Sequence, residues 1–518
     1  MTVLFYSNST LFFYHEVDPM ELFTAFSQAA KQYSGHTALE WEGGSLTYDQ
    51  LLEKSNIVGN FLRQAISSPR QNVGLLSANT PNFPFALFGI LGAEHIAVPL
   101  NPLLKPEEVA TLLTHAESPL LLYDPLLQES AEAAAAMMET DIRTIPIPQI
   151  LQNEKTDGVP LSPGVKSDNL SMILYTSGTT GNPKGVMLSH RNIYSNYASF
   201  TQVLDFNEKD TFLCILPLFH TYAMTVILFG ALLRGSRVIL FPQFTPQKVI
   251  EAFAREPNVV IVAVPPMIHL ITRFTPPEIA QNNNIRFFVS GGGPLPVDMA
   301  LAYKKKFNQE ILEGYGLTET SPVVAINSPE GNKIGTIGPP MPGVEVEIRT
   351  EQGQKLGVGE IGELCVRGDL VMLGYYKNHE MTKSVFWEDR WFRSGDLAVM
   401  DDEGYLKIVG RLKDLIVCGG ENIYPREIEE ILLRYPGVAE AAVVGEPNKL
   451  RSEVPHAFIV LQEDAKGQVA ESQLRKYCRE HLAEYKIPEG FTFVEDLPKT
   501  ATRKIQKEEI KTKYFPKK

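Results

Sequence analysis

The sequence has few of the residues that mark disulfide-rich or metal-binding proteins. Its 518 residues include only four cysteines, and no two of them form a CxxC pair: Cys214, Cys365, Cys418 and Cys478. Neither a disulfide framework nor a zinc site is predicted, and a reducing compartment such as the cytoplasm is the expected location. No run of about 18 apolar residues occurs, so no membrane-spanning helix is expected.

Positive charge is also scarce. Lysine and arginine number 48 against 61 aspartates and glutamates, a net charge of -13. Such a chain repels nucleic-acid phosphates, so no nucleic-acid partner is predicted, although a few local cations suffice to hold a nucleotide. Residues 1–14 lack a basic leading region and are a poor signal peptide. Residues 1–19 are interpreted as an N-terminal extension. A peripheral membrane contact and a homodimer stay open.

The length and the periodicity indicate an α/β protein. A chain of 518 residues exceeds what one core usually supports, so at least two domains are expected. Asp18 and Pro19 predict a helix start, as N-cap and first helical residue. Segments that alternate in the way typical of parallel sheets follow. They are helices over 47–62 and 80–91 and strands over 72–76 and 96–100. Residues 151–168 predict a surface loop.

The pattern of residue types along the sequence changes twice in the second half of the chain. Residues 343–396 contain short strands and glycine turns, which predict a small antiparallel β subdomain. Beyond residue 411, Pro425 opens a predicted helix and 441–444 form a predicted strand. We therefore predict a large N-terminal domain over 20–411, with mixed sheets, helices and the β subdomain. A small α+β C-terminal domain over 412–518 completes the fold.

The most specific motif is Tyr175-Thr-Ser-Gly-Thr-Thr-Gly-Asn-Pro-Lys-Gly185, which follows a short apolar run. Its glycines let backbone N–H groups approach an anion, its hydroxyls donate hydrogen bonds, and Lys184 adds a positive charge. The loop therefore suits a polyphosphate. It is not of the Walker type, because Pro183 precedes the lysine and Gly185 follows it. A kinase-like NTPase is accordingly disfavoured.

This string resembles the phosphate loop of the adenylate-forming superfamily, which includes acyl- and aryl-CoA synthetases, peptide-synthetase adenylation domains and firefly luciferase. The superfamily pattern extends from about residue 20 to the end of the chain. The resemblance implies that ATP and coenzyme A are co-substrates and that Mg²⁺ is the cofactor. It also implies that the ATP phosphates are bound by Thr176, Ser177, Gly178, Thr179, Thr180, Gly181 and Lys184.

Two further strings resemble the motifs of this superfamily that bind the base and the phosphates. Gly291 and Gly292 match the strand end beside adenine. In the string 314–320, Tyr315 and Gly316 match the adenine-stacking segment, Thr318 a phosphate ligand, and Glu319 a catalytic residue that helps to hold Mg²⁺. An aromatic face suits a purine, and a carboxylate suits a hard cation shared with phosphate.

The remaining nucleotide positions lie towards the C-terminus. Asp396 and Arg411 match residues that contact the ribose, and a carboxylate can accept two hydrogen bonds from a vicinal diol. Lys504 matches the catalytic lysine, whose charge stabilises the α-phosphate in the transition state. Arg503 stands where the family usually has glycine.

The resemblance also implies a moving C-terminal domain. Lys413 matches the hinge between the two domains, and Gly419 and Gly420 match the loop that lines the pantetheine tunnel after the small domain rotates. Adenylation and thioester formation would then use two arrangements of one chain.

The resemblance also implies that the segment 212–233 lines the pocket for the acid, and this segment contains no aspartate or glutamate. An amino-acid-activating domain needs a carboxylate there to pair with the substrate ammonium. His220 and Met224 match positions of the acyl pocket. We therefore predict a fatty acid–CoA ligase of lipid metabolism that activates a medium- or long-chain fatty acid. Three alternatives stay open: loading of a carrier-protein thiol, an aryl acid as substrate, and a sensor without turnover.

Overall fold

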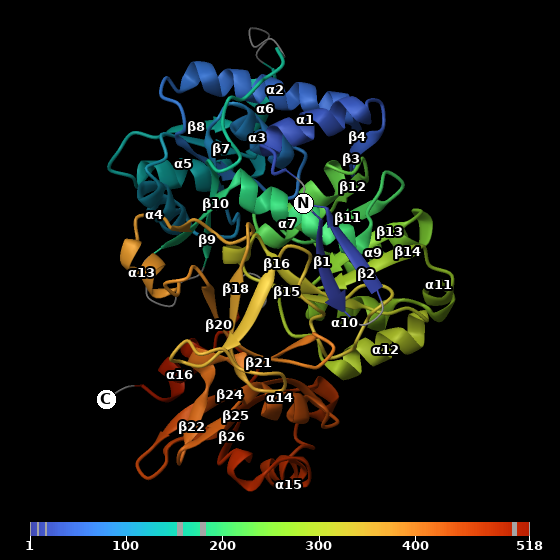
Figure 1. Ribbon diagram of the computed structural model, residues 1–518, viewed down its shortest axis with the longest axis vertical. Helices are drawn as coiled ribbons and strands as arrows, with labels where there is room; N and C mark the ends of the chain where they lie inside the picture. The colour runs from blue at the N-terminus through green and yellow to red at the C-terminus, as the bar shows by residue number, and fades with distance from the viewer. Residues whose placement is uncertain are drawn as a thin grey trace. The chain divides into compact units, whose positions relative to one another are not determined.

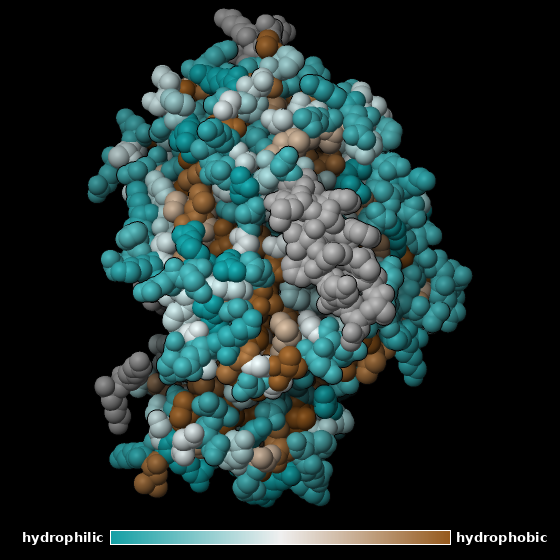
Figure 2. All heavy atoms as spheres, in the orientation of Figure 1, coloured by the Kyte–Doolittle hydropathy of each residue, from teal (hydrophilic) through white to brown (hydrophobic). Residues whose placement is uncertain are grey.

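The computed structural model describes residues 2–7, 10–15, 18–152, 159–176, 183–499 and 505–516 (Figure 1). The chain divides into two compact units. The first comprises Met1–Glu345 and Val366–Phe392, and the second Val346–Cys365 and Arg393–Lys518. Within the described ranges, no helix is long and apolar enough to cross a membrane. Hydrophilic residues cover most of the face shown in Figure 2, as expected for this charged chain.

The N-terminal extension contains a hairpin, in which β1 (Thr2–Ser7) pairs with β2 (Thr10–His15). The helix predicted to start at Asp18–Pro19 begins later, as α1 (Leu22–Gln32). The N-cap is Glu21, whose carboxylate accepts the backbone N–H of Phe23 at 2.9 Å and of Thr24 at 2.7 Å. The predicted N-cap at Asp18 is therefore wrong, because Glu21 satisfies the free N–H groups of the first turn.

A seven-stranded sheet forms part of the first unit. Its strands are β5 (Asn72–Leu76), β6 (Ile96–Leu100), β7 (Leu120–Tyr123), β8 (Arg143–Pro146), β9 (Leu170–Thr176), β10 (Lys184–Ser189) and β19 (Gly374–Tyr375). Their order is β19-β10-β9-β6-β5-β7-β8. The strands predicted over 72–76 and 96–100 are confirmed as β5 and β6. Every residue of both is buried, which is typical of a parallel sheet covered on both faces.

An eight-stranded sheet forms the rest of this unit. Its strands are β3 (Thr37–Trp41), β4 (Gly44–Thr47), β11 (Thr211–Cys214), β12 (Arg237–Leu240), β13 (Val259–Ala263), β14 (Ile285–Ser290), β15 (Leu312–Gly316) and β16 (Val323–Ile326). Their order is β16-β15-β14-β13-β11-β12-β3-β4. The strands from β3 to β15 along this order run parallel, so their carboxyl ends lie at one edge of the sheet.

Helices connect and cover these sheets. They are α2 (Tyr48–Ala65), α3 (Asn82–Gly92), α4 (Pro106–Ala116), α5 (Gln128–Ala136), α6 (Ile147–Leu151), α7 (His190–Leu204), the π-helix η2 (Ala223–Phe229), α8 (Gly230–Leu232), α9 (Pro246–Arg255), α10 (Pro265–Phe274), α11 (Pro277–Gln281), α12 (Val297–Phe307) and α13 (His379–Ser384), with the 3-10 turns η1 (Pro125–Leu127) and η3 (Thr318–Thr320). The predicted helices over 47–62 and 80–91 are confirmed as α2 and α3. Figure 1 shows α1, α2 and α3 lying together.

The prediction of a surface loop over 151–168 holds for only part of that segment. Residues 159–168 form no helix or strand, and 153–158 lie outside the described residues. Leu161, however, is buried, and its N–H donates to Oδ1 of Asn56 at 3.0 Å. The leucine packs beside Gly59 and Gly92, where an added Cβ would lie 2.3 Å and 2.7 Å from Leu161 Cδ1. The loop thus contributes one apolar anchor to the core.

The predicted β subdomain is a four-stranded sheet ordered β17-β18-β20-β21. Its strands are β17 (Glu345–Arg349), β18 (Gly362–Arg367), β20 (Phe392–Met400) and β21 (Leu406–Arg411). Most residues of this sheet belong to the second unit, together with the C-terminal residues. The predicted helix opened by Pro425 and the strand over 441–444 are also confirmed, as α14 and part of β24.

The C-terminal part of the second unit has helices on both faces of a five-stranded sheet. Its strands are β22 (Ile416–Cys418), β23 (Glu421–Ile423), β24 (Val438–Asn448), β25 (Ser452–Leu461) and β26 (Gly490–Phe493), with α14 (Pro425–Leu433), α15 (Glu471–His481) and α16 (Lys507–Tyr514), and the turns η4 (Leu412–Asp414), η5 (Glu463–Ala465) and η6 (Glu484–Lys486). Ala441 and Val443 of β24 share a core with α14 and α15, whereas Ala442 and Val444 share another with Ile510 of α16. Alternate residues of the strand thus face opposite layers.

Candidate functional site

The two ends of the phosphate-loop motif lie on β9 and β10, which pair antiparallel as the phosphate hairpin. Thr176 and Lys184 are register partners at its base, and both are half-buried. Gly185 is required, because an added Cβ would lie 2.7 Å from Cγ2 of Ile173. The residues of the loop itself lie outside the described residues: Ser177, Gly178, Thr179, Thr180 and Gly181.

Glu319 lies on η3, a turn that packs against β10. One carboxylate oxygen, Oε1, accepts a hydrogen bond from the hydroxyl of Tyr375 at 2.8 Å. The backbone carbonyl of Glu319 accepts the N–H of Met372 at 2.9 Å. The structure therefore places this carboxylate beside the strand that carries Lys184. Sequence reasoning missed Tyr375, which lies 56 residues away from its partner.

The other residues of this motif lie at the end of β15 and in η3. Tyr315 and Gly316 are the last residues of the strand, and Thr318 opens the turn, all of them half-buried. At Gly316 an added Cβ would lie 1.7 Å from the carbonyl oxygen of Pro322, so only glycine fits.

The predicted adenine segment adjoins the same sheet edge. Strands β14 and β15 are parallel neighbours, with Ser290 in register with Glu313, so Gly291 and Tyr315 both lie beyond this register at carboxyl ends of adjacent strands. Ligands of open α/β sheets bind at such ends. Gly291 allows close packing: an added Cβ would lie 2.6 Å from the hydroxyl of Tyr222. Gly292 has a φ of +72°, which favours glycine.

Tyr222 belongs to the segment predicted to line the acyl pocket. His220 is half-buried, and its Nδ1 accepts the N–H of Tyr222 at 3.2 Å. Met224 is buried at 1% exposure, and its N–H donates to the carbonyl of His220 at 3.0 Å. Met224 belongs to η2, every residue of which is buried. A π-helix is rare and frequently marks a functional site.

Three buried hydroxyls in this region have no hydrogen-bond partner in the part of the chain that the structure describes. They belong to Thr221, Tyr222 and Ser290. Burial raises the pKa of Tyr222 well above its usual range, so its hydroxyl stays protonated. Because buried polar groups are normally paired, these hydroxyls are candidates for binding a polar ligand group. Sequence reasoning singled out none of the three, although Thr221 and Ser290 adjoin the predicted His220 and Gly291, and Tyr222 lies between His220 and Met224.

Two predicted ribose contacts meet within the second unit. Asp396 on β20 and Arg411 on β21 are register partners, and Arg411 Nε lies 3.2 Å from Asp396 Oδ1. The carboxylate is buried, with a side-chain exposure of 6%, whereas the arginine is 48% exposed. The structure therefore brings these two predicted residues together. An ion pair of this kind holds the carboxylate in one orientation.

The predicted hinge and tunnel residues follow directly. Lys413 is exposed on η4, immediately after β21. Gly419 and Gly420 form the turn between β22 and β23, with φ values of +60° and +93°. Nothing lies within 4 Å of an added Cβ at either glycine. The backbone conformation, rather than crowding, therefore favours glycine here.

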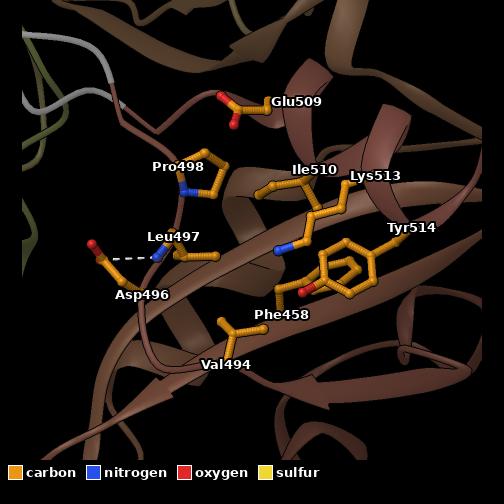
Figure 3. Close-up of a pocket in the computed structure, with 9 residues that line it drawn as sticks. All are labelled: Phe458, Val494, Asp496, Leu497, Pro498, Glu509, Ile510, Lys513 and Tyr514. Carbon is orange, nitrogen blue, oxygen red and sulfur yellow. Dashed lines mark hydrogen bonds between the residues drawn. The ribbon is translucent and has the colours of Figure 1, made fainter.

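The catalytic lysine predicted at Lys504, and Arg503 beside it, lie outside the described residues. The residues on either side are held together, because Lys499 and Ile505 form an antiparallel backbone bridge. Leu497 and Pro498 line a pocket of about 260 Å³ against α16 (Figure 3). Figure 3 shows that Asp496 also lines this pocket; its Oδ1 accepts a hydrogen bond from the N–H of Leu497, with a length of 2.9 Å.

The described side chains that could hold a magnesium ion here centre on Glu319. Across the described ranges, no group of three or more histidine, cysteine, aspartate or glutamate side chains could hold a metal ion. Magnesium in nucleotide sites is commonly bound by one or two carboxylates and the substrate phosphates. Glu319, placed beside β10, fits that kind of donor set.

The family follows from two matches. Residues 26–376 match the AMP-binding enzyme family, and residues 427–504 match the AMP-binding enzyme C-terminal domain. The chain belongs to the AMP-binding enzyme family. The superfamily resemblance and the fold class predicted from the sequence are thereby confirmed.

Curated and solved proteins resemble this AMP-binding enzyme over nearly its whole length. A feruloyl-CoA synthase of Amycolatopsis sp is 34% identical over 92% of this chain and 96% of its own. A long-chain-fatty-acid–CoA ligase of Mycobacterium tuberculosis is 33% identical over 90% and 93%. The solved O-succinylbenzoate coenzyme A synthetase from Bacillus subtilis, in complex with ATP and magnesium ion, is 30% identical, with a TM-score of 0.83 over 94% and 99%. The enzyme is an AMP-forming acid–thiol ligase.

Proposed function

We propose that the enzyme joins a medium- or long-chain fatty acid to coenzyme A through an acyl-adenylate. The supporting observation is the apolar character of the acyl segment. Residues 212–233 contain no aspartate or glutamate, and all of η2 is buried. Such a wall suits an alkyl chain, whose transfer from water is favourable by about 0.8 kcal/mol per methylene. The mycobacterial fatty-acid ligase among the relatives supports the same substrate class.

In the first half-reaction, the proposed roles follow the motifs. Thr176, Lys184 and the loop between them bind the ATP phosphates, while Tyr315, Gly316, Gly291 and Gly292 form the adenine site. Thr318 donates to the phosphates. Asp396 and Arg411 bind the ribose. These groups orient the nucleotide, which lowers the entropic part of the barrier.

The chemical step is attack on the α-phosphorus. A carboxylate oxygen of the acid forms the new P–O bond while the bond to pyrophosphate breaks. Lys504 stabilises the charge on the α-phosphate as this happens. Glu319 would hold Mg²⁺, which neutralises phosphate charge when bound.

In the second half-reaction, the C-terminal domain, which we place over 412–518, turns about Lys413. Gly419 and Gly420 then line the path of the pantetheine arm. The thiol of coenzyme A gives up its proton to solvent, and its sulfur attacks the acyl carbonyl. The thioester forms, and AMP leaves with the electron pair of the broken C–O bond. His220 and Met224 line the pocket for the acyl chain in both steps.

A hydroxylated aryl acid is the second candidate. The unpartnered hydroxyls of Thr221, Tyr222 and Ser290 favour it, since a buried polar group left unpaired costs about 1–3 kcal/mol. A phenolic hydroxyl on the acid would pair with them. The feruloyl-CoA synthase among the relatives points in the same direction.

One experiment separates the two substrates. Coenzyme A-dependent pyrophosphate release is measured with saturated fatty acids of increasing length and with hydroxycinnamic acids, for the wild type and Tyr222→Phe. For a fatty-acid enzyme, activity peaks at one chain length, and the substitution leaves kcat/KM within about twofold, because no hydrogen bond is lost. Preference for the hydroxylated acids, with a loss of about 100-fold in Tyr222→Phe, would select the aryl acid instead.

The control for this experiment is Tyr303→Phe. Tyr303 is also buried, and its hydroxyl also has no partner in the described part of the chain, but it lies on α12 in the core of the eight-stranded sheet. We expect no change in substrate preference.

The same assay of the wild type tests the remaining alternatives. Pyrophosphate release that stalls after about one equivalent in the presence of coenzyme A would identify a carrier-protein thiol as acceptor. No release with any acid would favour a sensor.

A further inference from the structure

The segment that contains Tyr375 is tied to the second strand of the phosphate hairpin. Tyr375 and Gly374 form β19, in register with Val186 and Met187 of β10. The N–H of Leu373 donates to the carbonyl of Met187 at 2.9 Å. The N–H of Tyr376 donates to the carbonyl of Gly185 at 2.8 Å. Any shift of β19 would therefore displace the base of the hairpin as well.

The same segment holds Glu319 at two points. The N–H of Met372 donates to the backbone carbonyl of Glu319 at 2.9 Å, and the hydroxyl of Tyr375 donates to Oε1 of its side chain at 2.8 Å. Tyr375 is buried, with 7% exposure, and burial raises the pKa of its hydroxyl well above the usual range. The hydroxyl is thus a permanent donor. It is the single side-chain donor to this carboxylate among the described residues.

Two asparagines of helix α7 hold the backbone segments next to Glu319 and Tyr375. Nδ2 of Asn196 donates to the carbonyls of Thr320 and Val323, at 3.1 Å and 2.7 Å, beside Glu319. Nδ2 of Asn192 donates to the carbonyls of Asp369 and Val371, at 2.7 Å and 2.9 Å, ahead of Tyr375. Both turns are therefore anchored on one rigid element, which immediately follows β10 in the chain.

We propose that Tyr375 is a positioning residue that orients the carboxylate of Glu319 towards the cation bound with the ATP phosphates. Its hydroxyl engages one carboxylate oxygen, and the second oxygen remains for the cation. This proposal rests on the proposed role of Glu319. A hydrogen bond to a charged group contributes more than a neutral one, so loss of the hydroxyl weakens binding of the metal–nucleotide complex selectively.

The test compares two adjacent tyrosines in the full-length protein. Tyr375→Phe removes only the hydroxyl that reaches Glu319. Tyr376→Phe is the matched control, because its hydroxyl instead accepts from Nδ2 of Asn72 at 3.2 Å and lies 3.5 Å from Oε2 of Glu117. Calorimetric titration gives the Kd of Mg·ATP and, without metal, of AMP. We expect Tyr375→Phe to raise the Kd of Mg·ATP about 10-fold and that of AMP less than about twofold.

Glu319→Gln provides the second arm. This variant removes the charge but keeps an oxygen that can accept from Tyr375. We expect the same selective loss of Mg·ATP affinity, with no further loss when Tyr375→Phe is added. An unchanged Kd for Mg·ATP in Tyr375→Phe would overturn the proposal. So would an equal loss of AMP affinity together with a lowered Tm, since that result indicates a structural role. A selective loss in Tyr375→Phe with no effect of Glu319→Gln would instead refute the role of Glu319.

Discussion

His190, the first residue of α7, is a buried histidine outside the proposed chemistry. Its Nδ1 accepts the backbone N–H of Leu22 at 3.3 Å and lies 3.3 Å from Oε1 of Glu21. Burial, with a smaller effect of Arg70, lowers the pKa of His190 to about 3, and burial raises that of Glu21. The imidazole is therefore neutral, with its proton on Nε2, and links the start of α1 to α7.

This histidine makes a defined contribution to the pH dependence of stability. Between its unfolded pKa of 6.5 and its folded pKa of about 3, the unfolded chain binds a proton that the folded chain does not. The free energy of unfolding should therefore fall as the pH is lowered below about 6.5, by up to about 1.4 kcal/mol per pH unit. The raised pKa of Glu21 acts in the opposite sense, since its contribution declines as the pH rises from 4.5.

The measurement is the urea midpoint of unfolding of the wild type and of His190→Gln between pH 5 and 7, compared as midpoints because a chain of two units need not unfold in a single transition. Glu21 is common to both proteins, so the difference between them isolates the histidine. His190→Gln should show the shallower decline towards low pH. His36→Gln, at an exposed position, is the control. Parallel curves for wild type and His190→Gln would contradict a buried neutral imidazole.

At the scale of elements, the residues that flank the segment proposed to carry Lys504 are held by backbone and side-chain contacts on both sides. Lys499 and Ile505 are bridged through their backbones. Lys507, at the start of α16, forms an ion pair with Glu429 of α14 at 2.6 Å, and both side chains are 16% exposed. Oε1 of Glu429 also accepts the N–H of Val443 on β24 at 2.7 Å. Two helices and a strand thus fix the position where the segment re-enters the fold.

Glu429→Gln tests whether this fastening matters for one half-reaction. Loss of a partly buried charge pair should let the segment shift, so acyl-adenylate formation should slow about 10-fold. Coenzyme A transfer from supplied acyl-adenylate should change little, because the role proposed for Lys504 is confined to adenylation. Lys504→Ala gives the upper limit of the effect. The control is Glu463→Gln, which removes an ion pair with Lys466 at an 88% exposed glutamate. Equal losses in both half-reactions would show a general loss of structure.

At the scale of the whole molecule, the proposed hinge lies in a short turn between two sheets. Strand β21 ends at Arg411, η4 covers Leu412–Asp414, and β22 begins at Ile416. Lys413 is exposed, so its side chain contributes little to a core. The backbone dihedrals of these few residues are therefore what a domain rotation would change.

Lys413→Pro restricts those dihedrals directly, since proline fixes its own φ and limits the preceding residue. We expect acyl-adenylate formation in a single turnover to persist, while steady-state thioester production falls about 10-fold or more. Lys413→Ala, which keeps the backbone free, should retain both. Similar behaviour of the proline and alanine variants would argue against a hinge at this position.

Several features follow from the sequence because they are local. Strands β5 and β6 were predictable from short apolar runs, and α14 from Pro425 at its first position. Gly316 stands in a contiguous motif, and its requirement is set by a carbonyl only six residues away in the chain. Family, fold class and acid–thiol ligase chemistry thus depend on strings that can be compared directly. The roles of Lys504 and of the phosphate loop remain predictions.

Other features required the tertiary structure. The chain alone favours Asp18 as an N-cap, but the folded position of α1 gives that place to Glu21. Tyr375 and Glu319 are 56 residues apart, and Tyr222 meets Gly291 from a different element. Such contacts arise when sheets and helices pack, and no local pattern encodes them. The sequence by itself determined the class of chemistry. The tertiary structure decided which carboxylate is oriented by which hydroxyl, because only packing brings donors and acceptors within hydrogen-bond distance.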